Sequence, residues 1–106
     1  MYDLEKLGLS EYESKAYVAL LKCGSLNTNQ LSKESGVPQS KIYDALYKLS
    51  QKNFVQVLDV RPKLFQANEP KKAIALLIRS RTAELEKMEK SISDSLVNLK
   101  KVNPLQ

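Results

Sequence analysis

The sequence predicts a mainly α-helical fold with one small β-hairpin, followed by a long C-terminal helix. Three observations predict it. Between residues 10 and 50, apolar residues recur at helical spacing in three segments that glycines separate. From 54 to 67, apolar and polar residues alternate as they do in strands. From 71 to 102 the chain has no glycine or proline, and one apolar row repeats every seven residues. We therefore place one domain over 1–69 and a coiled-coil-like helix over 70–106.

The composition argues against an enzyme. The 106 residues are 42% hydrophobic and 27% charged, which is typical of one globular domain. The chain has no histidine and no glycine-rich phosphate loop, so the commonest general base and the commonest metal ligand are missing. The single Cys23 forms neither an internal disulfide nor a metal site, and we expect it to be a small buried residue. The sequence predicts no catalytic residues, no cofactor and no metal.

Charge and hydropathy bear on partners and location. The net charge is +5, which favours a polyanionic partner only weakly. The apolar runs are too short to cross a bilayer. The start of the chain, Met1–Lys6, lacks the pattern of a signal peptide. We expect a cytoplasmic protein with no membrane partner.

The first predicted helix covers about 10–23. Ser10 stands three residues before Glu13, which is the spacing of a capping box. Tyr17 belongs to the apolar stripe that follows, and we expect its ring in the core or in a dimer contact. Gly24 ends this helix.

The second helix begins at Asn27 or Thr28, which can both cap it, and it runs to Ser35. Its apolar anchor is Leu31, and Gly36 ends it because glycine adopts a left-handed backbone angle without penalty.

The third helix begins at Pro38, where a missing N–H costs nothing. Gly36, Val37 and Pro38 form a sharp joint, with Val37 expected in the angle between the helices. The predicted buried stripe of the third helix is Ile42, Ala45, Leu46 and Leu49.

Two short strands follow, over 54–58 and 63–67, with a basic turn at 59–62. Because an isolated two-stranded hairpin is only marginally stable, it has to pack on the helices. We expect Phe54 and Phe65 to make that contact.

A helix-turn-helix followed by such a hairpin, or wing, is chiefly a reader of nucleic acid. Its second helix enters the major groove and the wing follows the backbone or the minor groove. Gln39 suits adenine, and Tyr43 suits a thymine methyl group or a phosphate. Asp44 is awkward beside DNA and is expected either to pair with a neighbouring lysine or to accept from cytosine, and Tyr47 is expected to pack or to lie at the rim. The candidate DNA-binding residues are Thr28, Gln39, Ser40, Lys41, Tyr43, Lys48, Arg61 and Lys63.

The long helix carries an apolar stripe that so small a domain cannot cover. About thirty residues span roughly 45 Å, so the stripe needs a partner, most simply a second copy of the chain. Docking within one chain or onto another protein is the alternative. The candidate dimerisation residues are Ile78, Leu85, Met88, Ile92, Leu96 and Leu99.

The stretch 7–75 resembles the N-terminal winged-helix domain of the TrmB family of archaeal transcriptional regulators. The resemblance rests on the segments 7–13, 16–17 and 35–46, and on the wing segment 61–67 with the proline at 70. It implies a cytosolic, usually dimeric regulator that places the helix after Gly36 and the wing on operator DNA.

Larger members of this family carry a C-terminal effector domain that binds sugars. This chain ends at Gln106, soon after the long helix. We therefore expect no sugar-binding domain, and the effector is unknown.

The main hypothesis is a homodimeric transcriptional regulator that binds double-stranded DNA sequence-specifically. One alternative is a winged-helix module that binds proteins, since residues 1–68 carry nine basic and seven acidic side chains, a net charge of only +2. The other is an architectural protein that coats DNA without choosing a sequence. The operator, the target genes, the sign of regulation and the parallel or antiparallel pairing of the long helix stay open.

Overall fold

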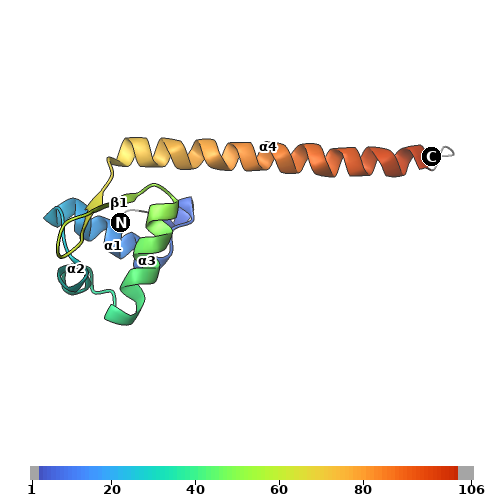
Figure 1. Ribbon diagram of the computed structural model, residues 1–106. Coiled ribbons are helices and arrows are strands. Elements are labelled where there is room, and N and C mark those ends of the chain that lie inside the picture. Colours follow the sequence, from blue (N-terminus) through green and yellow to red (C-terminus); the bar gives the residue numbers. More distant parts are fainter. Residues whose placement is uncertain (1–2, 103–106) are drawn as a thin grey trace. The chain divides into compact units, whose positions relative to one another are not determined.

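The computed structural model describes residues 3–102 (Figure 1). Its contacts divide the chain into two compact units, Met1–Ile74 and Ala75–Gln106, and each is described by itself. The predicted fold class, a winged helix-turn-helix followed by a long helix, is confirmed. In chain order the elements are the short 3-10 helix η1 (Leu4–Leu7), α1 (Glu11–Cys23), α2 (Thr28–Ser35), α3 (Gln39–Gln51), β1 (Val55–Leu58), β2 (Leu64–Ala67) and α4 (Pro70–Val102).

Helix α1 begins at the predicted capping box. The Glu13 backbone N–H donates to Ser10 Oγ at 3.1 Å, and the Ser10 N–H donates to Glu13 Oε2 at 3.3 Å. Two backbone donors that the helix leaves unpaired are thus satisfied by side chains. Gly24 follows the last residue of α1, as predicted.

Asn27 is the N-cap of α2, and Gly36 ends α2 with φ at 77°. Val37 is only 1% exposed, as predicted for the joint between α2 and α3. Pro38 differs by one position from its prediction. It is the N-cap of α3, with ψ at 146°, and Gln39 is the first helical residue. An extended backbone at Pro38 is what turns the chain from α2 into α3.

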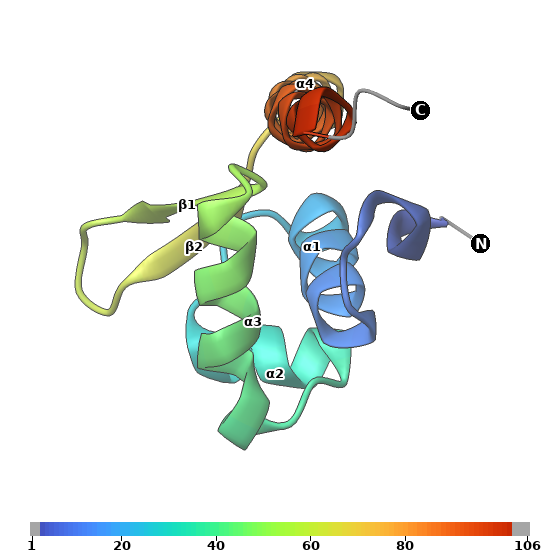
Figure 2. The same ribbon diagram turned by 90° about the vertical axis from the view of Figure 1, so that its right-hand side faces the viewer.

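The core of the first unit lies where α1, α2 and α3 meet (Figure 2). Tyr17 and Phe54 pack edge to face there, with ring centroids 5.1 Å apart. The Tyr17 hydroxyl donates to the Asn68 carbonyl oxygen at 2.8 Å, and its pKa is raised by burial and by the nearby Glu69 charge. The predicted apolar positions are confirmed: Leu31, Ile42, Ala45, Leu46 and Leu49 are all buried.

The wing is an antiparallel pair in which Val55 faces Ala67 and Leu58 faces Leu64. Both strands begin one residue later than predicted. The Phe54 N–H donates to the Leu49 carbonyl oxygen at 2.8 Å and so closes the end of α3. Phe54 and Phe65 are buried, as expected for the residues that hold the wing.

One connection of the wing was not predicted. Leu26, in the loop before α2, forms a bridge with Phe65, through hydrogen bonds of 3.1 and 2.8 Å. The base of the wing is therefore tied to the helix-turn-helix by backbone as well as by side chains, which stabilises a hairpin that is marginal alone.

The prediction that Cys23 is buried is wrong: its side chain is exposed. The apolar spacing of α1 does continue through Ala16 and Leu20 to Cys23, but α1 ends there. Within residues 3–102, no element buries that last position. Cys23 Sγ lies 3.8 Å from Glu34 Oε2 instead.

Helix α4 runs unbroken from Pro70 to Val102. Its 33 residues correspond to about 50 Å of helix. Every residue from Ile78 to Lys100 is exposed. Among the described residues, no helix is long and apolar enough to span a membrane.

Candidate nucleic-acid interface

The outward face of α3 carries the predicted contact residues. Its buried stripe turns toward α1 and α2, which leaves the remaining positions in solvent. Tyr43 is 65% exposed and Tyr47 is 64% exposed, so Tyr47 is not packed in the core, which was one of its two expected positions. Such large exposed aromatic side chains mark a surface available to a partner. The other predicted residues of α3, Gln39, Ser40, Lys41 and Lys48, are exposed as well.

Two hydrogen bonds join the start of α2 to this face. Gln39 Nε2 donates to Asn29 Oδ1 at 2.7 Å. One turn further along α3, the Tyr43 hydroxyl lies 3.4 Å from Thr28 Oγ1. The structure thus brings three predicted residues, Thr28, Gln39 and Tyr43, into one cluster. Asn29 was missed by sequence reasoning, and only its position beside Thr28 pointed toward it.

The two lysines on α3, Lys41 and Lys48, differ in whether an acidic side chain lies close to them. Lys48 Nζ lies 3.2 Å from Asp44 Oδ2, one turn away, so one of the two expectations for Asp44, pairing with a neighbouring lysine, is met. Within the described part of the chain, no ion pair involves Lys41. Lys41 therefore presents its full charge, whereas Asp44 offsets that of Lys48.

The wing adds two cations. Arg61 and Lys63 are exposed in the turn between β1 and β2. Figure 2 shows this turn extended away from the three helices, on the side where α3 lies. The ion pairs that join residues 3–102 include neither of the two. Asp59 lies in the same turn and reduces its net positive charge.

One charged pair in this unit is structural. Lys52 Nζ donates to Glu13 Oε1, and also to the Gly8 carbonyl oxygen at 3.0 Å. The Glu13 side chain is only 4% exposed. Burial opposes its ionisation, but hydrogen bonds from Lys52 and Ser10 and the Lys52 charge outweigh burial and lower the pKa of Glu13. This pair joins the start of α1 to the end of α3, and sequence reasoning did not single it out.

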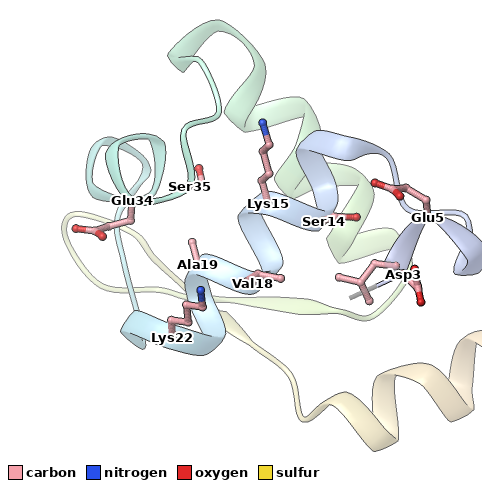
Figure 3. A pocket seen from close by; sticks show the side chains of 10 residues that line it. Asp3, Glu5, Ser14, Lys15, Val18, Ala19, Lys22, Glu34 and Ser35 are labelled. Carbon is pink, nitrogen blue, oxygen red and sulfur yellow. The ribbon is translucent and has the colours of Figure 1, made fainter. Parts of the chain in front are cut away.

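A hollow of about 380 Å³ lies between η1, α1 and the end of α2 (Figure 3). Its lining mixes signs, with Glu5 and Glu34 opposed by Lys15 and Lys22. None of the predicted DNA-binding residues lines it. Among the described residues, no group of three or more histidine, cysteine or acidic side chains is arranged to hold a metal ion.

The second candidate surface is the apolar stripe of α4. By helical spacing its members fall on one side of the helix. Like the polar residues between them, they are exposed, which is unusual for a contiguous apolar row. The six predicted residues and their exposed fractions are Ile78 54%, Leu85 62%, Met88 50%, Ile92 58%, Leu96 60% and Leu99 66%.

Comparison with known proteins places these features in a family. The family model described as sugar-specific transcriptional regulator TrmB matches residues 4–71. The sugar-sensing transcriptional regulator TrmBL1 of Pyrococcus furiosus is 34% identical over 94 residues, which are 89% of this chain and 28% of TrmBL1.

Solved structures of other regulators are also similar to this chain. The structure of TrmBL2, described as an archaeal chromatin protein with a novel mode of DNA binding, superposes with a TM-score of 0.87 at 25% identity. That match covers 96% of this chain and 40% of TrmBL2. The transcriptional regulator Tm0710 of Thermotoga maritima has a TM-score of 0.57 at 18% identity, over 96% of this chain and 79% of its own, and shares the fold.

The chain thus spans well under half the length of both TrmB-type relatives. The family match covers the helix-turn-helix and the wing, the same region in which the exposed α3 face was found. The matching family model describes transcriptional regulators. The chain belongs to the TrmB family of winged-helix transcriptional regulators.

Proposed function

We propose that the chain is a homodimeric regulator that binds double-stranded DNA sequence-specifically, in the cytoplasm. In this proposal α3 lies in the major groove, and the wing at 59–63 contacts the backbone or the minor groove. Gln39 and Tyr43 contact bases, while Lys41, Arg61 and Lys63 neutralise phosphates. The observation that carries the proposal is the polar, aromatic face of α3, which the fold leaves in solvent beside two wing cations.

Ser40 and Lys48 complete the contact surface on α3, and Thr28 completes it on α2. Ser40 is a permissive donor or acceptor near the start of α3. Lys48 reaches a phosphate only by exchanging its Asp44 partner, 3.2 Å away. We therefore expect a smaller contribution from Lys48 than from Lys41.

Dimerisation is assigned to α4. The exposed stripe from Ile78 to Leu99 has the spacing of a coiled-coil seam, and a second copy supplies an identical apolar surface. Residues 1–69 would then bind DNA and 70–106 would pair the copies. Two recognition helices roughly 34 Å apart would meet successive major grooves of an inverted repeat.

A second candidate function is an architectural one. The similarity to TrmBL2, described as a chromatin protein, favours it. An architectural protein would use the same cations but would make no base contacts that discriminate. The two functions therefore share a surface and differ only in whether Gln39 and Tyr43 choose a sequence.

The test is selection of bound fragments from a random duplex library at two salt concentrations. The proposal predicts a recovered inverted repeat whose affinity falls steeply with salt, because phosphate contacts release counterions. Binding without a common sequence would establish the architectural function instead. Absence of binding at low salt would contradict both and favour a protein-binding module.

A further inference from the structure

We infer that Asn29 is a positioning residue for sequence recognition: it holds Gln39 in the one orientation in which Gln39 reads a base. This inference rests on the proposed DNA-binding function. It starts from the 2.7 Å hydrogen bond in which Gln39 Nε2 donates to Asn29 Oδ1. Both residues are exposed, so burial does not account for a bond between them.

The bond leaves Gln39 with a defined set of free groups. A glutamine amide has two N–H donors and one carbonyl oxygen. When the N–H given to Asn29 is the one that points away from the carbonyl oxygen, the other N–H and the oxygen remain side by side. This donor and acceptor pair complements the N7 acceptor and the N6 donor of adenine in the major groove.

The orientation matters because glutamine is flexible. A free glutamine side chain samples many rotamers and loses that freedom when it binds. It can also present its amide either way round to a base. A residue already held by Asn29 has lost both kinds of freedom before DNA arrives, which improves binding and base choice together.

A second contact one turn along supports the same arrangement. Thr28 Oγ1 lies 3.4 Å from the Tyr43 hydroxyl. Thr28 and Asn29 are consecutive at the start of α2, and Gln39 and Tyr43 are neighbours on one face of α3 because they are four residues apart. The first turn of α2 therefore holds two adjacent side chains of the recognition face.

The start of α2 is itself firmly fixed. The Gln30 N–H donates to Asn27 Oδ1 at 2.8 Å, and the Asn27 N–H donates to Gln30 Oε1 at 3.0 Å. This capping box does not include Asn29, so Asn29 can be changed without removing the cap. The Asn29 Nδ2 group remains for water or for a phosphate oxygen.

The test compares affinities for the selected operator and for a duplex altered at the base pair that Gln39→Ala ceases to distinguish. Wild type should prefer the operator by about tenfold or more. Asn29→Ala should lose most of that ratio, while its helix content and its melting temperature stay those of wild type.

Asn29→Asp is the matched control. Its carboxylate still accepts from Gln39 Nε2, so the ratio should be restored. Its negative charge should weaken binding to both duplexes equally. In a Gln39→Ala background, Asn29→Ala should leave the ratio unchanged, because the residue it positions is gone.

Three results would overturn the inference. An Asn29→Ala protein with the wild-type ratio would show that Gln39 needs no positioning, while the proposed function stands. Loss by Asn29→Ala of discrimination at a different base pair, one that Gln39→Ala still distinguishes, would show that Asn29 reads a base itself. A wild-type protein that prefers neither duplex would remove sequence-specific binding and this role with it.

Discussion

The two units of this chain differ in where their apolar side chains lie. In the winged-helix unit, residues such as Tyr17, Ile42 and Phe54 are at most 2% exposed, and even the charged Glu13, which pairs with Lys52, is buried. In α4, Leu85 is 62% exposed and Ile92 is 58% exposed, with the same apolar chemistry. The winged-helix unit buries most of its large apolar side chains, whereas α4 leaves a row of them exposed, and in the proposed function a second copy covers that row.

This difference separates two ways in which a sequence encodes function. In the winged-helix unit, function lies in what remains on the surface after the core has formed, so it is polar and local. In α4, the proposed pairing of two copies would depend on the apolar row itself. Substitutions in the core of the winged-helix unit should therefore destabilise its fold. Substitutions in the apolar row of α4 should instead weaken the pairing of two copies.

The largest effect is expected from Leu85→Glu with Ile92→Glu in α4. Burying two large aliphatic side chains from each of two copies contributes on the order of 6 kcal/mol or more, and the new charges would repel. The variant should be monomeric at concentrations where wild type is dimeric. Sedimentation equilibrium measures this, and the winged-helix unit should keep its melting temperature.

The matched control places two glutamates at Ser80 and Ala83, which lie on the opposite side of α4 by helical spacing. It makes the same change in charge and should stay dimeric. Equal dissociation of both variants would mean that repulsion, and not the apolar row, decides pairing.

The next largest effect is expected from Phe54→Ala. Phe54 is fully buried and packs against Tyr17, so its truncation should cost about 3–5 kcal/mol in the free energy of unfolding. Chemical denaturation of the dimer-deficient variant isolates this change. A loss below about 1 kcal/mol would show that the wing does not depend on this contact.

Glu13→Gln should act through pH. Because the pKa of Glu13 is lowered in the folded state, its ionised form stabilises the fold above the unfolded-state pKa, and this contribution disappears as pH falls through the folded pKa. The variant should lose about 2 kcal/mol at pH 7. The deficit should shrink as the pH is lowered from 7 toward 3, because the wild-type carboxylate is protonated as the pH falls through its folded-state pKa.

The control for that change is Glu11→Gln. Glu11 forms a solvent-exposed pair with Lys15 at 3.4 Å, and such pairs contribute little. Urea denaturation at both pH values distinguishes the two variants. A Glu13→Gln deficit that is the same at pH 3 and pH 7 would contradict the assigned role of its charge.

The smallest effect is expected from Lys63→Ala in the wing. Loss of one phosphate contact should weaken binding to every sequence and reduce the salt slope by about one. Lys22→Ala removes the same charge from the hollow beside α1 and should leave the slope unchanged. An identical slope for all three proteins would exclude Lys63 from the DNA contact.

Much of the fold could be predicted because its signals are local. The Ser10 capping box, the Gly36 turn and the alternation from Phe54 onward each depend on a few neighbouring residues. The predicted strand bounds differ from the observed ones by one residue, as at Phe54, whose N–H donates to the Leu49 carbonyl oxygen at the end of α3 while β1 begins at Val55.

The interface could be predicted less completely. The exposure of Gln39 and Tyr43 could be predicted because both residues lie outside the buried stripe of α3. Their hydrogen bonds to Asn29 and Thr28 do not, because those depend on how α2 crosses α3. The same holds for Cys23, whose burial was expected from its residue type alone, and for Lys52, whose partner is 39 residues away.

The most direct test of this division between the units compares two duplexes, one with both half-sites of the selected repeat and one with a single half-site. Leu85→Glu with Ile92→Glu should bind the single half-site as wild type does. On the full repeat its affinity should fall by about 100-fold or more, since the second unit is no longer tethered. Wild-type affinity of this variant for the full repeat would contradict the account, because α4 would then have no part in pairing the DNA-binding units.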